Sequence, residues 1–105
     1  MGFLDSLKGK GITEYAAEAA EQGIKVIDVR EPNEFAQGHI PGAINVPLSA
    51  LGGILDVAPD KNEKLYLHCL GGGRSGKAVN QLKTVGYTDL TNIGGIKDYK
   101  GPIER

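Results

Sequence analysis

Short apolar runs recur along the chain and predict the strands of a sheet. The run at residues 24–29 is β-branched and nearly continuous in its apolar positions. Such a run is typical of a strand that is buried on both faces of a parallel sheet. With three further runs, the predicted strands are residues 24–29, 43–46, 65–69 and 89–93.

Helices are predicted between these strands. Thr13 is a suitable N-cap for an alanine-rich helix over residues 14–21, and Gly23 can end that helix in the left-handed conformation. Ser75 is the predicted N-cap of the last helix. The remaining predicted helices are residues 32–37, 48–57 and 75–86.

The alternation of strands and helices sets the fold class. Short βα spacings imply right-handed βαβ units and a parallel sheet that is covered on both faces. We therefore predict an α/β fold with a small open parallel sheet of about five strands and helices on both faces.

The length of 105 residues fits one domain, which we expect over residues 12–105 after a flexible segment at residues 1–11. Twelve basic and thirteen acidic residues give a net charge of −1, without the basic excess that nucleic-acid binding requires. No apolar run approaches the roughly 18 residues of a membrane span. We expect a cytoplasmic protein with neither a nucleic-acid nor a membrane partner.

The segment that follows the third predicted strand carries the candidate chemistry. Cys69 is the only cysteine, so it cannot form an intramolecular disulfide. Three glycines at residues 71–73 and then Arg74 follow it. A glycine-rich turn before a helix directs backbone N–H groups at one point and forms an anion cradle. A thiolate in such a cradle, near a guanidinium, should have a pKa below its usual value of about 8.5 and act as a nucleophile.

Three other interpretations of the loop are weaker. Residues 71–76 match the spacing of a dinucleotide-binding fingerprint, but little chain follows and Asp89 precedes its strand instead of ending it. With Lys77 the same residues match a phosphate-binding P-loop, except that Ala78 replaces the hydroxyl residue that binds Mg²⁺. If Cys69 were an inert buried thiol, the glycines and arginine that follow it would have no evident packing purpose.

Residues 69–78, CLGGGRSGKA, resemble the active-site loop of the rhodanese sulfurtransferases, C-x-x-G-x-R-S-G-K-A. Residues 26–47 resemble the amino-terminal signature of that family, and residues 86–95 resemble its carboxy-terminal end. The resemblance covers about residues 12–100. Tyr99 departs from it, because many members carry tryptophan there, and this difference concerns packing.

The resemblance implies that Cys69 takes a sulfane sulfur from a donor such as thiosulfate and becomes a persulfide. The persulfide then passes the sulfur to an acceptor such as cyanide, a thiol or a protein. Loop amides would stabilise the persulfide charge, and Arg74 would neutralise an incoming anionic donor. No metal or organic cofactor is required. The implied substrate-binding residues are Leu70, Gly71, Gly72, Gly73, Arg74 and Ser75.

Asp28 and Arg30 stand at the carboxyl end of the strand at residues 24–29. Ligands bind at this edge of open parallel sheets. The resemblance implies that both residues support the site, with Asp28 orienting an arginine. The alternative for Arg30 is an i,i+4 ion pair with Glu34.

The two histidines are weak metal-ligand candidates, because His39 and His68 lack ligand spacing with Cys69. We expect His39 to bond backbone in its turn. His68 should point to the opposite face of its strand from Cys69.

Two alternative functions differ from sulfur transfer by an enzyme. Isolated domains of this kind also act as non-enzymatic sulfur carriers or partner-docking modules. Related phosphatases and arsenate reductases share the fold but carry C-x₅-R, whereas the spacing from Cys69 to Arg74 is C-x₄-R.

Overall fold

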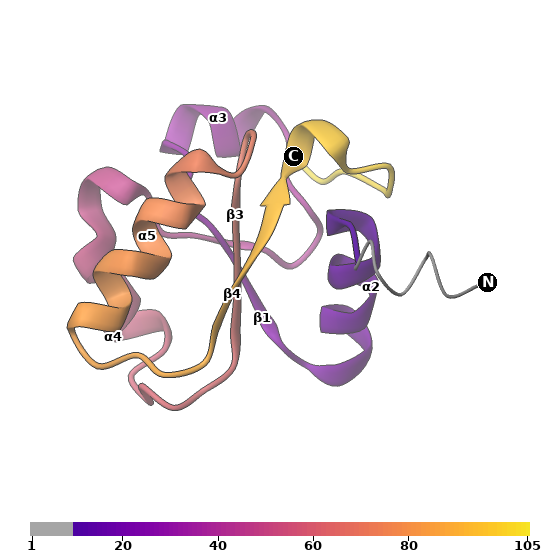
Figure 1. Cartoon of the computed structure of the whole chain (residues 1–105). Coiled ribbons are helices and arrows are strands. Elements are labelled where there is room, and N and C mark those ends of the chain that lie inside the picture. The colour runs from indigo at the N-terminus through magenta and orange to yellow at the C-terminus, as the bar shows by residue number, and fades with distance from the viewer. Residues whose placement is uncertain (1–9) are drawn as a thin grey trace.

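Helices and strands alternate along the chain (Figure 1). The computed structural model describes residues 10–105, so residues 1–9 of the predicted flexible segment lie outside the described part. The strands are β1 (Lys25–Asp28), β2 (Ile44–Asn45), β3 (Leu65–Cys69) and β4 (Leu90–Gly95). The α-helices are α2 (Ile12–Gln22), α3 (Pro32–Gln37), α4 (Ile54–Val57) and α5 (Gly73–Thr84), and the 3₁₀ helices are η1 (Leu48–Gly53) and η2 (Ile96–Asp98).

All strand pairs are parallel, and the strand order is β2-β1-β3-β4. Helix α2 covers one face of this sheet, α4 and α5 cover the other, and α3 lies beyond the carboxyl ends of the strands (Figure 1). The predicted α/β class is confirmed, with four strands in the described residues instead of about five. No helix in this part of the chain has the length and apolarity to cross a bilayer.

Residues of β3 alternate between two apolar layers. Leu65, Leu67 and Cys69 pack in the cluster that contains Ala78 and Leu82 of α5. Tyr66 packs in a second cluster with Ile12 and Ala19 of α2. All five residues of β3 are buried, which confirms the prediction of a strand that is covered on both faces.

Both predicted N-caps are wrong. Gly11 precedes the first turn of α2, and the hydroxyl of Thr13 instead accepts a hydrogen bond from the Lys100 N–H at 2.9 Å. Helix α5 begins two residues before Ser75, after Gly72, whose φ of 102° is in the left-handed region. Glycine adopts this conformation without a steric cost, so the loop can turn sharply there.

The predicted helix over residues 48–57 is also wrong as one unit. The segment forms the six-residue 3₁₀ helix η1 and then one turn of α-helix, α4. Ala50 has non-helical backbone angles, and two glycines with low helix propensity follow it at residues 52–53. The helix at residues 32–37, the strand at residues 65–69 and the left-handed Gly23 (φ 72°) are confirmed.

Candidate active site

Cys69 ends β3 at the carboxyl edge of the sheet, where the chain turns into α5. The sulfur accepts a hydrogen bond from the Gly72 N–H, with an N to Sγ distance of 3.0 Å. Only 1% of Cys69 is exposed. The sulfur therefore lies at the base of the loop, where only a small group or a terminal atom can reach it.

The pKa of the Cys69 thiol lies below its ordinary value. Burial raises this pKa, because it disfavours the charged form. Hydrogen bonds from the hydroxyl and backbone of Ser75 and from the N–H groups of Gly72 and Gly71 lower it by more. The loop thus stabilises negative charge on the sulfur, as the sequence led us to expect.

The Ser75 hydroxyl has one proton and three acceptors around it. The acceptors are Asn92 Oδ1 at 2.8 Å, the Gly72 carbonyl at 3.2 Å and Cys69 Sγ at 3.4 Å. A charged sulfur is a stronger acceptor than a neutral thiol. The hydroxyl can therefore turn from Asn92 to the sulfur when the thiolate or persulfide forms.

Substitution of Ser75 by alanine should raise the pKa of Cys69, because it removes a hydrogen bond that lowers this pKa. We expect the pH midpoint of Cys69 alkylation by iodoacetamide to move upward and the rate at neutral pH to fall severalfold. Ser49→Ala is the control, since the Ser49 hydroxyl bonds Glu31 and not the loop. An unchanged midpoint would mean that the Ser75 hydroxyl keeps donating to Asn92 Oδ1 and does not donate to the sulfur.

Asn92 is a site residue that the sequence analysis did not single out. From β4, its Oδ1 accepts the Ser75 hydroxyl and the Gly94 N–H at 3.1 Å, while its Nδ2 donates to the Gly72 carbonyl at 3.0 Å. One side chain thus holds both the loop and the hydroxyl that faces the sulfur. The one indication in the sequence is that Asn92 lies within residues 86–95, which resemble the carboxy-terminal end of the family.

Gly95 allows the loop to lie directly against β4. It is the register partner of Cys69, and a β-carbon at this position would overlap the Leu70 carbonyl oxygen and lie 2.5 Å from Gly71 Cα. Both neighbours are backbone atoms of the loop, so neither can move without displacing the N–H groups around the sulfur.

Gly95→Ala should therefore displace the Cys69 loop and destabilise the domain by about 1–3 kcal/mol, the usual cost of overpacking. We expect a lower denaturant midpoint and a higher pKa of Cys69 in an alkylation profile. Gly52→Ala is a matched control, because a β-carbon there meets no atom within 4 Å. Equal behaviour of the two variants would contradict the close approach of β4 and the loop.

Arg74 forms a bidentate ion pair with Glu34 of α3. The Nη1 to Oε1 distance is 2.7 Å and the Nη2 to Oε2 distance is 3.0 Å. The Arg74 guanidinium, with the Glu31 N–H, lowers the pKa of Glu34 to about 2. The alternative of an Arg30–Glu34 ion pair is thus wrong, because Glu34 is engaged by Arg74.

Asp28 and Arg30 form a buried ion pair beside the site. Asp28 is fully buried and Arg30 is 6% exposed. The Arg30 Nη2 donates to Asp28 Oδ2 at 2.8 Å and to the Gly38 carbonyl at 2.8 Å, and Nε bonds both carboxylate oxygens. Asp28 does orient an arginine, and the pair fixes β1 to the chain that follows α3.

His68 lies between this ion pair and the cysteine. Its Nδ1 is 3.0 Å from the Cys69 carbonyl oxygen and its Nε2 is 3.6 Å from Asp28 Oδ2. Burial lowers the pKa of His68, so the ring is neutral near pH 7. His39 bonds backbone as predicted, with Nδ1 2.9 Å from the Phe35 carbonyl oxygen.

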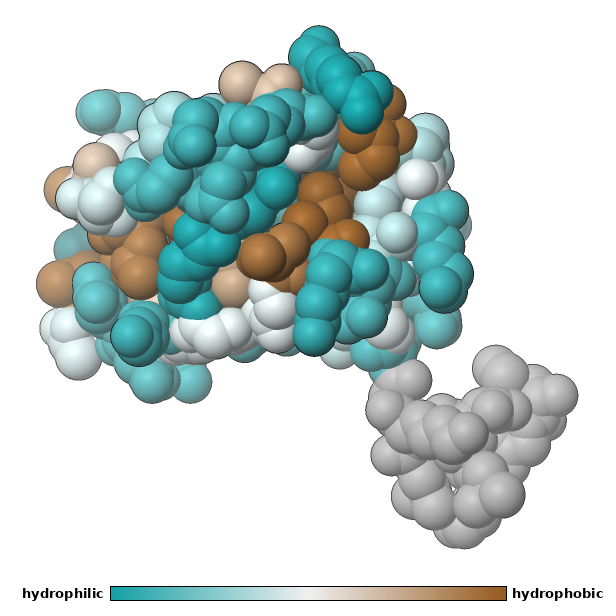
Figure 2. Space-filling model, turned by 90° about the horizontal axis from the view of Figure 1, so that it is seen from above, coloured by the Kyte–Doolittle hydropathy of each residue, from teal (hydrophilic) through white to brown (hydrophobic). Residues whose placement is uncertain are grey.

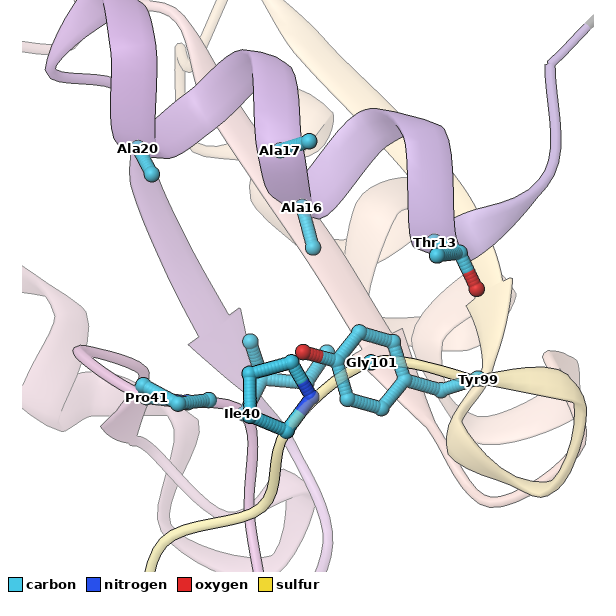
Figure 3. Close-up of a pocket in the computed structure, with 9 residues that line it drawn as sticks. Thr13, Ala16, Ala17, Ala20, Ile40, Pro41, Tyr99 and Gly101 are labelled. Atoms are coloured by element: carbon cyan, nitrogen blue, oxygen red, sulfur yellow. The ribbon is translucent and has the colours of Figure 1, made fainter.

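A hollow of about 230 Å³ lies on the α2 side of the sheet and is separate from the loop. In Figure 3, Tyr99 and Ile40 lie on one side of it and the alanine side chains of α2 lie on the other. None of its lining residues belongs to the segment at residues 69–75. The candidate active site is therefore the Cys69 loop and not this hollow.

Comparison with known proteins agrees with the geometry of the loop. The family profile of the Rhodanese-like domain matches residues 12–101. The chain is a rhodanese-like domain. The thiosulfate sulfurtransferase PspE of Escherichia coli is 43% identical over 77 residues, which cover 72% of this chain and 74% of that protein.

Two further proteins place this rhodanese-like domain among its relatives. The putative sulfur carrier protein YrkF of Bacillus subtilis is 29% identical over 81% of this chain and 46% of its own length. A solved structure of rhodanese with anions from E. coli has a TM-score of 0.72 and 40% identity, covering 77% of this chain and 96% of that chain. The family thus includes proteins that are described as enzymes and as carriers.

Figure 2 shows the face of the rhodanese-like domain that lies at the top of Figure 1, where the β3–α5 turn is found. Apolar surface occupies its centre and hydrophilic residues border it. Leu70, next to Cys69, is 49% exposed. The loop thus offers an apolar contact beside a buried, charge-stabilised sulfur.

Proposed function

We propose that this domain is a sulfurtransferase that moves a sulfane sulfur from a donor such as thiosulfate, through a Cys69 persulfide, to cyanide or a thiol. The observation that carries the proposal is the Gly72 N–H aimed at the Cys69 sulfur at 3.0 Å, in a loop that lowers the pKa of the thiol. The similarity to a thiosulfate sulfurtransferase supports it.

The proposed reaction has two steps. The Cys69 thiolate attacks the outer sulfur of thiosulfate, the S–S bond of the donor breaks, and its electron pair leaves with sulfite. Cyanide or a thiolate then attacks the outer sulfur of the persulfide, and the electron pair returns to Cys69. Each step conserves charge, and the two steps need neither a metal nor an organic cofactor.

The loop residues have distinct proposed roles. The N–H groups of Gly71 and Gly72 and the Ser75 hydroxyl stabilise negative charge on the inner or outer sulfur. Gly73 begins α5, and Leu70 supplies an apolar contact at the rim. These residues bind the donor beside the Arg74–Glu34 ion pair.

Three charged residues support the loop without binding the donor. Arg74 is held beside the loop by its ion pair with Glu34, which also balances its positive charge. Asp28 and Arg30 are positioning residues, because they hold the carboxyl end of β1 beside β3. Within residues 10–105, neither side chain forms a hydrogen bond with residues 70–75.

A sulfur carrier is the second candidate, because one relative is described as a putative sulfur carrier protein. The same persulfide would form, and a protein thiol would be the acceptor. A phosphatase is disfavoured for two reasons. The loop is one residue shorter than C-x₅-R, and Glu34 already accepts hydrogen bonds from both terminal nitrogens of Arg74. The cytoplasmic location expected from the sequence stays a prediction.

Intact-mass measurement before and after thiosulfate tests the proposal. We expect a gain of one sulfur atom that cyanide or dithiothreitol removes, and no turnover of p-nitrophenyl phosphate. Transfer of the sulfur only to a protein thiol would favour the carrier. Absence of the adduct, or efficient phosphatase activity, would overturn the proposed function.

A further inference from the structure

The positive charge of Arg74 is locally balanced. Its guanidinium donates from both terminal nitrogens to the two carboxylate oxygens of Glu34. An anion that approaches the Cys69 loop therefore meets a neutral pair at this position. A cation near the loop that is not paired with a carboxylate would supply the attraction that this pair lacks.

Lys97 of η2 lies against the loop from the side of β4. Its backbone N–H donates to the Leu70 carbonyl at 3.1 Å, so η2 is anchored next to Cys69. A β-carbon built on Gly71 would lie 3.7 Å from Lys97 Cε. The stem of the lysine thus runs along the loop backbone at Gly71, and its ammonium group, one bond further, lies at the rim.

This ammonium group is available to an anion. Lys97 is exposed, and within residues 10–105 its Nζ takes part in no ion pair and no side-chain hydrogen bond. The Gly71 N–H is one of the hydrogen-bond donors that lower the pKa of Cys69. The Cα of the same residue faces the Lys97 side chain. One residue of the loop thus separates the sulfur from the lysine stem.

We propose that Lys97 is a substrate-binding residue that holds the oxyanion end of the sulfur donor at the rim while its outer sulfur enters the loop. The donor class is a sulfane sulfur bonded to a sulfonate or sulfonyl group. When the S–S bond breaks, negative charge accumulates on the leaving sulfite or sulfinate, and the ammonium stabilises it. The inference rests on the proposed function for the identity of the donor.

A pair of alkylating reagents tests the charge without sulfur transfer. Iodoacetate and iodoacetamide are similar in size, but only iodoacetate is charged. In Lys97→Ala we expect the rate of Cys69 alkylation by iodoacetate to fall about threefold relative to iodoacetamide, and in Lys97→Arg we expect this ratio to be kept. Lys83→Ala is the charge-matched control, because Lys83 is in the last turn of α5, at the opposite end from the loop.

Single-turnover persulfide formation then tests the donor. Lys97→Ala should slow the reaction about tenfold with dianionic thiosulfate and about threefold with a monoanionic arylthiosulfonate, because Coulomb energy scales with charge. Added salt should reduce both differences. Each rate is compared with that of wild type and Lys83→Ala for the same donor.

The outcomes distinguish the role of Lys97 from the proposed function of the domain. An unchanged alkylation ratio in Lys97→Ala, an equal loss in Lys83→Ala, or a loss in Lys97→Arg would each overturn the role of Lys97. A reduced ratio without any persulfide in wild type would refute the proposed function and leave Lys97 as the anion-binding residue of the loop.

Discussion

Replacing Cys69 with serine should abolish sulfur transfer while the domain stays folded. Serine is nearly isosteric with cysteine, so the hydrogen bonds of the Gly72 N–H and Ser75 hydroxyl can persist. It cannot form a persulfide, and Cys69 is the only cysteine of the chain. We expect thiosulfate:cyanide activity to fall to background and the adduct of one sulfur atom to disappear.

The control for Cys69→Ser is a comparison of unfolding curves. A midpoint close to that of wild type would show that the lost activity reflects the missing thiol and not a disrupted core. Activity equal to wild type in the variant would contradict the assignment of Cys69 as the residue that accepts the sulfur. It would also remove the reason for a loop that stabilises negative charge at this position.

The largest effect on stability is expected for Arg30→Ala. This change leaves the fully buried Asp28 carboxylate without its guanidinium and the Gly38 carbonyl without a donor. Loss of one partner of a buried ion pair typically costs about 3–5 kcal/mol. Since domains are stable by about 5–15 kcal/mol, denaturant titration should show a large fall in the unfolding free energy.

Two further variants make this result specific. Glu63→Ala breaks the partly exposed Lys25–Glu63 pair and should cost no more than about 1 kcal/mol. Asp28→Asn added to Arg30→Ala should recover part of the loss, because it removes the uncompensated charge. A cost for Arg30→Ala as small as that of Glu63→Ala would show that the buried pair contributes little.

The Arg30 substitution should also affect the site, because β1 pairs with β3 along its whole length. His68, opposite Asp28 in that register, contacts the Cys69 carbonyl. Any activity lost in Arg30→Ala is therefore expected to accompany lost stability. This behaviour distinguishes a positioning residue from one that touches the donor.

Local pattern alone predicted β3 and the candidate nucleophile, Cys69. The apolar run at residues 65–69 predicted β3 with its observed bounds. A strand that is buried on both faces is a nearly continuous apolar run, so its ends are visible in the sequence. The glycines after Cys69 predicted a turn that directs N–H groups at the sulfur. Such features depend on neighbours a few residues apart, which the sequence places in contact by itself.

Local pattern was misleading where two local signals competed. Ser75 has the residue type of an N-cap, but the left-handed Gly72 starts α5 earlier and directs the Ser75 hydroxyl to Asn92 and the sulfur. The apolar spacing at residues 48–57 suggested one helix, while Ala50 has non-helical backbone angles and the segment forms η1 and then α4. At Gly72 the conformational freedom of glycine outweighed the N-cap preference of serine.

The charge partners of the site were decided by the tertiary structure. Glu34 is four residues from Arg30 and 40 from Arg74, yet it pairs with Arg74, because α3 lies above the carboxyl ends of the strands and Asp28 already engages Arg30. A sequence states which charges exist, but not which are brought within hydrogen-bonding distance.

The sequence by itself therefore determined the α/β class and the family, and it predicted Cys69 as the candidate nucleophile at the start of its loop. Only the tertiary structure decided that Asn92 holds the Ser75 hydroxyl, that Gly95 lies against the loop and that Lys97 reaches its rim. The physical reason is that turns and strands follow from short-range sterics and apolar periodicity. Contacts across the sheet instead depend on the register of β3 and β4, which is set when the whole core packs.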